Sequence, residues 1–370
     1  ESFDVSAPAP PANPTTNTPT PPEYNRVRVI RYRADTPNPT PVRAVIVAMP
    51  GFLGGAASFD PLARALVKRG TMAQTPVEVW AIDRRSNLLE DLRGMDMAER
   101  MNDPEIAAGY YSQANVTLDG RAFAGYRTTN DPALSYMSEW GLATTLRDLR
   151  AVIERVPSPR THVILMGHSL GATLVEAYAA WDFDGTAGYR SIAGLVLVDG
   201  VASGNAISET DYRNGATGGI TGLGYAGTTP LRQSGPWFVA LPLLGVRALG
   251  ISEIVARRAR TAPDRVVMDS DRDQVFRVLL TVTGLPPMTN AAAMGFALDD
   301  ASCPLSFAAM SVGAPTGGPV RMQSNPLVMG TTITVPASAT DTYRWTDAPG
   351  VTPREFTSVA NAAAAWSATP

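Results

Sequence analysis

The stretch HVILMGHSLGATLVEAY, residues 162–178, decides the fold of this chain. Apolar residues lead into Gly167-His168-Ser169-Leu170-Gly171, and mostly small and apolar residues follow. We interpret this pattern as a strand, a sharp turn and a helix, with Ser169 at the apex. The two glycines let strand and helix approach closely, which leaves the serine exposed at the carboxyl edge of a sheet. The pattern therefore predicts a nucleophile elbow with Ser169 as a candidate nucleophile.

Strand and helix patterns alternate on both sides of the elbow. Segment 44–49 is continuously apolar, which is typical of a strand buried on both faces. Segment 192–200 is also predicted to be a buried strand. Segment 24–35 alternates apolar residues with arginines and resembles an exposed edge strand. The sequence also predicts a strand at 77–83 and helices at 60–70, from 141 and at 170–181. This order predicts the α/β class, a mostly parallel sheet with helices on both faces.

Composition excludes several function classes. The chain has 370 residues, a net charge of −3 and a pI near 5.6, so nothing attracts it to nucleic acid or anionic membranes in general. No run approaches the roughly 20 apolar residues of a membrane span, so we expect no integral membrane segment. One cysteine and two histidines make a zinc site improbable, and we expect no cofactor and no metal. Arg257, Arg258 and Arg260 are interpreted as a solvated helix face.

The N-terminal residues 1–23 form a Pro/Thr-rich segment, including APAPPANPTTNTPTPPE. Such a composition predicts an extended spacer that does not pack into a core. A start at Glu1 without an initiator methionine, followed by this segment, suggests an exported protein, whether periplasmic, cell-surface or extracellular. The alternative is a cytosolic domain with an arbitrary boundary in front of it.

From about 42 to 200 the chain resembles the first two-thirds of an α/β-hydrolase fold protein of the serine esterase or lipase kind. The stretches that carry the resemblance are AVIVAMPGFLGG, VWAIDRR, VILMGHSLGATLVEAYA and GLVLVDG. The resemblance implies an oxyanion hole made by the N–H of Leu170 and the N–H of Phe52. It also implies a catalytic histidine far downstream of Ser169, after the last strand. In many members a His-Gly pair opens the oxyanion loop, where this chain has Pro50-Gly51.

No histidine follows His168 in this chain. His162 lies at the opposite end of the predicted strand, about 23 Å from Ser169 at about 3.3 Å per residue. His168 is interpreted as a packed elbow residue. Residues 340–370 also lack a pattern for the two further strands that the resemblance implies. We therefore hypothesise that a second polypeptide, formed by cleavage after about Pro370, completes the fold and supplies the base.

Other assignments stay open at this point. Asp199 ends the strand at 192–200 and is a candidate triad acid, although many family members use a later position. Residues 201–345 are interpreted as a lid insertion and 346–370 as a C-terminal segment, with the hypothesised cleavage site at its end. The lid's apolar stretches favour an acyl or other apolar small-molecule substrate. A serine hydrolase of carboxylic esters is the first hypothesis. The alternatives are a non-catalytic binding or structural protein and a peptidase or amidase.

Overall fold

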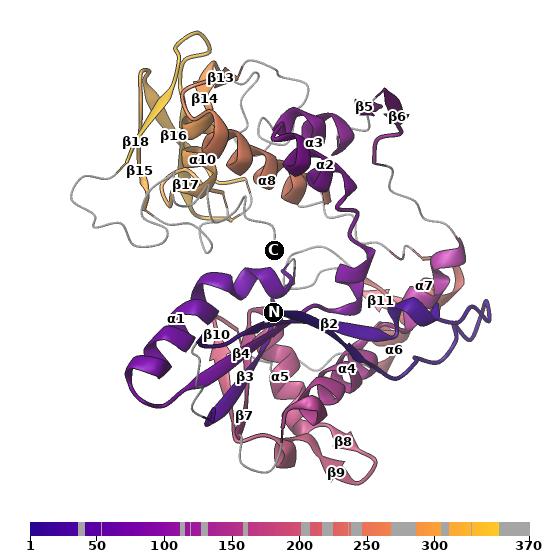
Figure 1. Ribbon diagram of the computed structural model, residues 1–370. Coiled ribbons are helices and arrows are strands. Elements are labelled where there is room, and N and C mark those ends of the chain that lie inside the picture. The colour runs from indigo at the N-terminus through magenta and orange to yellow at the C-terminus, as the bar shows by residue number, and fades with distance from the viewer. Residues whose placement is uncertain are drawn as a thin grey trace. The chain divides into compact units, whose positions relative to one another are not determined.

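The computed structural model is divided by its contacts into two units (Figure 1). The first comprises residues 1–90 and 129–238, and the second comprises 91–128 and 239–370. The residues that the structure describes are 1–35, 41–52, 54–111, 115–118, 120–126, 132–157, 162–200, 208–216, 225–235, 237, 246–267, 286–304, 311–326 and 328–347.

A six-stranded sheet of order β1-β2-β4-β3-β7-β10 forms the centre of the first unit. β3, β4, β7 and β10 run parallel, whereas β2 is antiparallel to β4 and β1 is antiparallel to β2. The predicted α/β class and mostly parallel sheet are therefore confirmed. The strand bounds are β1 (Ser2–Ser6), β2 (Arg26–Tyr32), β3 (Ala44–Met49), β4 (Val77–Ile82), β7 (His162–His168) and β10 (Gly194–Val198).

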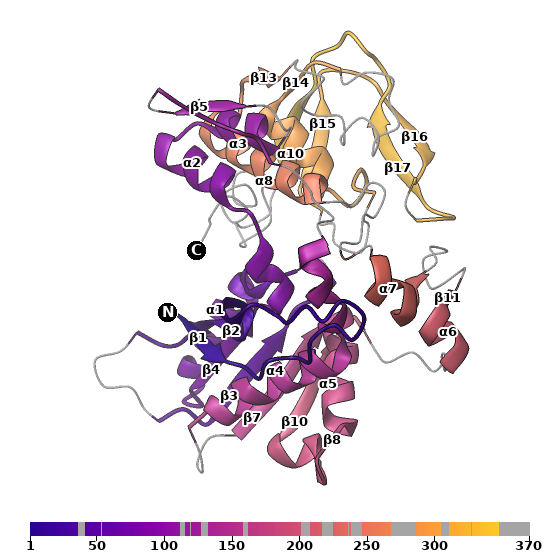
Figure 2. The ribbon, with the colours of Figure 1, turned by 90° about the vertical axis from the view of Figure 1, so that its right-hand side faces the viewer.

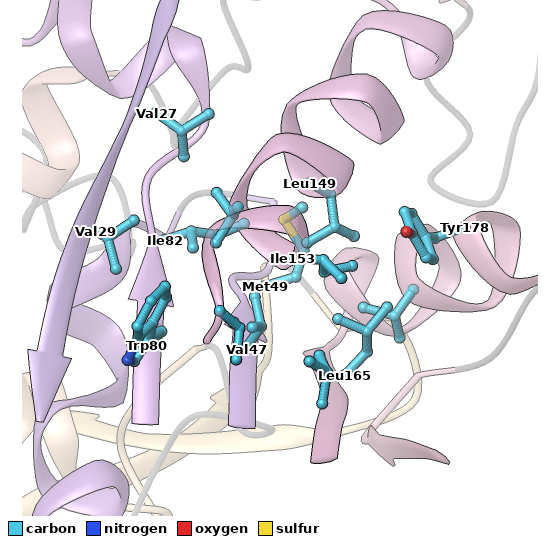
Figure 3. Packing of buried hydrophobic residues seen from close by; sticks show 14 of the residues in the cluster. Val27, Val29, Val47, Met49, Trp80, Ile82, Leu149, Ile153, Leu165 and Tyr178 are labelled. Carbon is cyan, nitrogen blue, oxygen red and sulfur yellow. The ribbon is translucent and has the colours of Figure 1, made fainter. Parts of the chain in front are cut away.

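Helices cover both faces of this sheet, as the alternation predicts (Figures 1 and 2). Helix α1 (Asp60–Met72) packs on one face, where its Ala63 and Val67 meet Ala48 and Met166. Helices α4 (Leu142–Arg155) and α5 (Leu170–Ala180) pack on the other face. Figure 3 shows side chains of that core, among them Val47, Met49, Leu149, Leu165 and Tyr178. Successive residues of β3 point to opposite faces, so β3 needs apolar residues throughout.

The N-terminal segment packs against the first unit, so the predicted free spacer is wrong. Its first residues form β1, with Val5 buried opposite Val27. Asn13 is fully buried, and its amide donates to the carbonyls of Ser135 and Arg232 at 2.9 and 3.0 Å. Side-chain hydrogen bonds of this kind let a proline-rich segment pack without a hydrophobic core of its own.

Two strands differ from the sequence-based expectation in their surroundings. β2 is not an edge strand, because β1 pairs with it, and its Val27 and Val29 are buried. β10 is the opposite case. The sequence predicted a buried strand, but Leu195, Val196 and Leu197 are 38%, 42% and 40% exposed. Among the described strands only β7 pairs with β10, which leaves β10 at the edge of the sheet.

Shorter elements complete the first unit. Its remaining helices and strands are α6 (Glu209–Asn214), α7 (Thr228–Ser234), β8 (Asp182–Phe183), β9 (Thr186–Ala187), β11 (Gly215–Ala216) and β12 (Tyr225–Ala226). Its short 3-10 helices are η1 (Pro22–Tyr24), η2 (Ala56–Phe59), η3 (Arg85–Leu89), η4 (Pro132–Glu139) and η5 (Gly188–Ser191).

The second unit combines four helices with small antiparallel sheets among its described residues. The helices are α2 (Arg93–Met101), α3 (Pro104–Tyr111), α8 (Val246–Thr261) and α10 (Asn290–Leu298). The paired strands are β5 (Val116–Leu118) with β6 (Arg121–Phe123), β13 (Val266–Val267) with β14 (Met288–Thr289), β15 (Gly313–Thr316) with β18 (Arg344–Asp347), and β16 (Val320–Ser324) with β17 (Thr332–Pro336). Phe296, Ile333 and Tyr343 belong to a buried cluster that joins α8, α10, β14 and β17.

Arg257 and Arg258 of α8 do not lie on a solvated face, whereas Arg260 is exposed as expected. Arg258 is 4% exposed and bonds the carboxylate of Glu105 on α3 through Nε and Nη2, both at 2.8 Å. Arg257 pairs with Glu99 on α2 and with Glu253 on its own helix. The expectation for these two residues is therefore wrong, because carboxylates from a distant stretch of sequence make burial of the guanidinium groups possible.

Several expectations concern residues outside the described ranges. The sequence also has helical patterns at 271–283 and 354–366 and an apolar stretch at 236–250, and the two patterns and most of the stretch lie outside those ranges. The predicted lid at 201–345 and C-terminal segment at 346–370 remain predictions, and the contacts distribute residues 201–345 over both units. In the described part of the chain, no helix has the length and apolar character needed to cross a membrane.

Candidate active site

Ser169 occupies a strained turn between β7 and α5. Its φ is 52° and its ψ is −121°, a conformation that L-residues rarely adopt. Such backbone strain costs on the order of 1–3 kcal/mol and persists where the surrounding structure enforces it. The strand, the turn and the helix lie where the sequence predicts them. A strained serine between a strand and a helix is what the predicted nucleophile elbow requires, and the role of Ser169 as nucleophile stays a prediction.

The two glycines that flank Ser169 are required by close backbone contacts. A Cβ on Gly167 would lie 2.2 Å from the carbonyl oxygen of Gly171. A Cβ on Gly171 would lie 2.1 Å from the carbonyl oxygen of Met49, at the end of β3. Both distances are far below van der Waals contact. The absence of side chains at these positions lets β7, α5 and the end of β3 meet around the serine.

The end of β10 holds the elbow from the other side. The backbone N–H of Ser169 donates to the carbonyl of Val198 at 2.9 Å. Just beyond, Asp199 has a φ of 50°, and a Cβ on Gly200 would lie 2.4 Å from the carbonyl oxygen of Ser169. The register pairs Val198 with His168, so Asp199 comes next to Ser169 along the neighbouring strand. Asp199 is thus placed near the elbow, and its role as triad acid stays a prediction.

The loop after β3 turns back beside the serine. The N–H of Gly54 donates to the carbonyl of Gly51 at 3.2 Å, which closes a tight turn containing Phe52. A Cβ on Gly51 would lie 3.2 Å from the Cβ of Ser169, so the loop passes directly beside the elbow. Phe52 is 47% exposed. This placement suits the predicted use of the Phe52 N–H as an oxyanion donor.

Leu170 is the first residue of α5. The first N–H groups of a helix have no partner within that helix, and the helix dipole adds positive character there. The Leu170 N–H is therefore available to a developing negative charge. The assignment of Phe52 and Leu170 as the oxyanion donors remains a prediction that this local geometry supports.

The residues following β4 reach back to the oxyanion loop. The Arg84 guanidinium donates through Nη2 to the carbonyls of Gly51, Phe52 and Gly54 at 2.8, 2.6 and 3.2 Å. Asp83 accepts from the N–H of Ala56 at 2.7 Å. Burial raises the pKa of Asp83, although the hydrogen bond from Ala56 and nearby arginines oppose the shift. Burial lowers the pKa of Arg84, against the attraction of Asp83.

Sequence reasoning missed these two residues. The stretch VWAIDRR carries part of the family resemblance, but that resemblance assigns no role to Asp83 or Arg84. Their partners lie about 30 residues upstream, and the local sequence pattern does not predict such long-range contacts. The signal that could have found them is a charged pair directly after a buried strand, at the carboxyl edge where sites in parallel sheets gather.

A buried ion pair supports the same edge of the sheet. Arg85 and Asp148 bond through two contacts of 2.7 Å, and both side chains are almost fully buried. Arg85 also donates to the carbonyls of Tyr24 and Pro8 at 2.9 and 2.7 Å. Burial raises the pKa of Asp148, and Arg85 opposes the shift. This pair joins η3, α4 and the N-terminal segment, and we assign it a structural role.

Both histidines are exposed, and they lie at the two ends of β7. His162 begins the strand, which separates it from Ser169 by the strand's full length. His168 approaches the oxyanion loop, since a Cβ on Gly51 would lie 3.1 Å from its Nδ1. Among the described residues, no hydrogen bond joins the Ser169 hydroxyl to either imidazole. The general base is therefore not identified within the described part of the chain.

A small cavity of about 70 Å³ adjoins the carboxyl ends of β3 and β4. It is well below the roughly 300–1,000 Å³ of typical ligand pockets. Ser169 is not among its lining residues, so we do not assign substrate binding to it. The lining comprises Val27, Met49, Ile82, Asp83, Arg84, Arg85, Ser86, Trp140, Thr144, Thr145, Asp148 and Leu149.

Nothing in the described residues assembles a metal centre, since no cluster of three or more His, Cys, Asp or Glu side chains occurs there. No known family model matches the chain, and no curated protein matches it. Solved structures do match it.

The similar solved structures are α/β-hydrolase fold proteins. The peroxisomal α/β-hydrolase Lpx1 from Saccharomyces cerevisiae is 13% identical over 58% of this chain and 48% of its own, with a TM-score of 0.34. An epoxide hydrolase from an endophytic Streptomyces is 11% identical over 48% of this chain and 32% of its own, with a TM-score of 0.25. Mouse α/β hydrolase domain-containing protein 10 is 13% identical over 46% and 44%, with a TM-score of 0.21.

The chain spans less than two thirds of the length of each of these proteins. The evidence for the candidate site is the strand order of the sheet and the strained backbone of Ser169.

Proposed function

We propose that this chain, which has the α/β-hydrolase fold, is a serine hydrolase of carboxylic esters with Ser169 as its nucleophile. The observation that carries the proposal is the strained Ser169 directly beside the Gly51–Gly54 turn. A nucleophile and a loop of backbone donors in this arrangement match the needs of acyl transfer, in which negative charge develops on the former carbonyl oxygen.

The reaction proceeds through an acyl-enzyme. The Ser169 Oγ attacks the acyl carbon while a histidine takes its proton, and the N–H groups of Phe52 and Leu170 bind the oxyanion. Collapse of the tetrahedral intermediate breaks the ester bond, and the protonated histidine gives its proton to the departing alcohol. Water then attacks the acyl carbon, with the same histidine as base, and releases the acid and the free serine. Asp199 orients the histidine in this scheme.

The histidine comes from a separate polypeptide of the same precursor in this proposal. The support is twofold: neither His162 nor His168 bonds the Ser169 hydroxyl, and β10 exposes apolar side chains at the edge of the described sheet. Leu195 and Leu197 alternate with Val196, so both faces of the strand carry uncovered apolar groups. An edge that no described strand pairs with, and that has apolar residues on both faces, suits a further parallel strand and a covering helix.

A fluorophosphonate probe tests the nucleophile, because it reacts with serines activated by a base and an oxyanion hole. We expect the native protein to be labelled at Ser169 and Ser169→Ala to remain unlabelled. Ser6→Ala, on the exposed edge of β1, is the control and retains labelling. Absence of labelling in the native protein contradicts the enzyme proposal and favours a non-catalytic binding protein on this scaffold.

Two further measurements address the finer assignments. Release of acid from short-chain esters but not from the corresponding amides supports an esterase over a peptidase or amidase.

Mass spectrometry of the denatured native protein tests the second polypeptide, because a histidine-containing partner is expected beside the 39.2 kDa chain. Export also remains a proposal, which fractionation of the producing cells tests.

A further inference from the structure

Three backbone carbonyls of the oxyanion loop converge on one guanidinium nitrogen. Arg84 Nη2 lies 2.8 Å from the carbonyl oxygen of Gly51, 2.6 Å from that of Phe52 and 3.2 Å from that of Gly54. Arg84 lies just after the end of β4, 30 to 33 residues from the three carbonyls that it binds. The loop is thus fixed by one side chain as well as by its own turn hydrogen bond.

The geometry of the peptide bond converts this contact into an orientation of the site. The carbonyl of Gly51 and the N–H of Phe52 belong to one planar trans peptide unit, so they point in opposite directions. When Arg84 holds the carbonyl, the N–H is directed away from Arg84. Because Gly51 lies against the elbow, this peptide unit is the part of the loop next to Ser169.

The charge of Arg84 acts on the same peptide unit. Among the described residues, no carboxylate forms a close ion pair with Arg84, and its guanidinium bonds only carbonyl oxygens. Its Nε is buried without a hydrogen-bond partner in the described part of the chain. A positive charge at a carbonyl oxygen polarises the peptide and strengthens the N–H at its other end as a donor.

We propose that Arg84 is a positioning residue of the oxyanion hole, which directs and polarises the Phe52 N–H by binding the carbonyl side of its peptide unit. This inference rests on the proposed function of Ser169. It differs from a purely structural role, in which Arg84 only closes the turn. A structural role predicts lower stability with little effect on the chemical step of the folded fraction.

The test compares Arg84→Met and Arg84→Lys with the native protein on a p-nitrophenyl ester of a short acid. Complete loss of one oxyanion donor lowers kcat by roughly 10²–10³-fold. We expect misdirection of the donor in Arg84→Met to lower kcat by about 10–100-fold, with KM changed by less than about threefold. Arg84→Lys keeps the charge but loses the planar fork, so an intermediate kcat is expected. Arg64→Lys, in a surface ion pair on α1, is the control and leaves kcat unchanged.

Chemical rescue separates positioning from folding. Arg84→Ala is assayed with added guanidinium chloride at millimolar concentration and with the same concentration of sodium chloride. Recovery of kcat by guanidinium alone supports the proposal. The rate of fluorophosphonate labelling at Ser169 should fall and recover in parallel.

The outcomes distinguish this inference from the proposed function. If the native protein neither labels nor hydrolyses the ester, the proposed function is wrong and this inference falls with it. If the native protein is active and folded Arg84→Met and Arg84→Lys retain its kcat, only the positioning role is overturned. Should Arg84→Met not fold, the Arg84→Lys and rescue measurements decide the matter in the same way.

Discussion

The carbonyl of Val198 accepts the backbone N–H of Ser169 over 2.9 Å, so the last strand of the sheet holds the candidate nucleophile in place. A Cβ on Gly200 would lie 2.4 Å from the Ser169 carbonyl oxygen, which tightens the same contact. β10 therefore has two roles: its end holds Ser169, and it exposes apolar residues at an edge that no other described strand pairs with.

Gly171→Ala tests the close packing of the elbow. The new Cβ would lie 2.1 Å from the Met49 carbonyl oxygen, and neither backbone segment can move away cheaply. We expect the free energy of unfolding to fall by at least about 2 kcal/mol, measured by urea denaturation. Gly194→Ala is the matched control, because nothing lies within 4 Å of its Cβ position. Equal stability of the two variants contradicts the steric argument.

Glu78→Gln tests a pH dependence of stability. Burial by itself favours the neutral form of Glu78, but hydrogen bonds from Arg31 and the Trp80 indole outweigh it and lower the pKa of the carboxyl. A lowered pKa in the folded state stabilises the protein above the unfolded value of about 4.3. That stabilisation is lost as the pH falls through the folded pKa.

The native protein should therefore lose more stability than Glu78→Gln when urea denaturation is repeated from pH 6 down to pH 3. Glu154→Gln, which removes an exposed carboxylate from an i,i+4 pair with Arg150, is the control and keeps the native slope. Parallel curves for the native protein and Glu78→Gln speak against a lowered pKa at this site.

Asp199→Asn tests the triad acid. Asparagine tolerates a φ of 50° as aspartate does, so the change removes charge without straining the backbone. Loss of a triad aspartate by this substitution lowers kcat by about 10⁴-fold, and we expect a fall of that order on an ester substrate. Asp184→Asn is the control, because Asp184 also has a positive φ, 55°, but lies in an exposed turn. A kcat within tenfold of the native value excludes Asp199 as the acid.

Val196→Asp tests the proposed contact of β10 with a second polypeptide. Val196 is 42% exposed in this chain, so a carboxylate there is solvated as long as nothing covers it. Covering it with an apolar partner would bury an unpaired charge, which is strongly unfavourable. We expect Val196→Asp to lose the histidine-containing polypeptide in native mass spectrometry. Val320→Asp, at a position 45% exposed on β16, should retain it. Retention of the partner by both variants argues against docking at β10.

Sequence pattern was sufficient for the elements that form the core of the first unit. The apolar runs in β3 and β7 and the period of α4 are local features, and the structure has these elements where they were predicted. The glycines around Ser169 were informative for the same reason, because the absence of a side chain has a steric consequence wherever strand and helix cross closely. Sequence thus determined the fold class, the mostly parallel sheet and the strained serine at its edge.

Tertiary structure decided what depends on partners far away in the chain. The N-terminal segment packs because β2 and Ser135 supply its hydrogen bonds, and Arg258 is buried because Glu105 reaches it. Arg84 binds a loop 30 to 33 residues upstream, and β10 is exposed because no described strand pairs with its outer edge. Composition and periodicity indicate which residues of a segment favour burial and which favour contact with water. They do not indicate which distant segment packs against that segment in the folded chain.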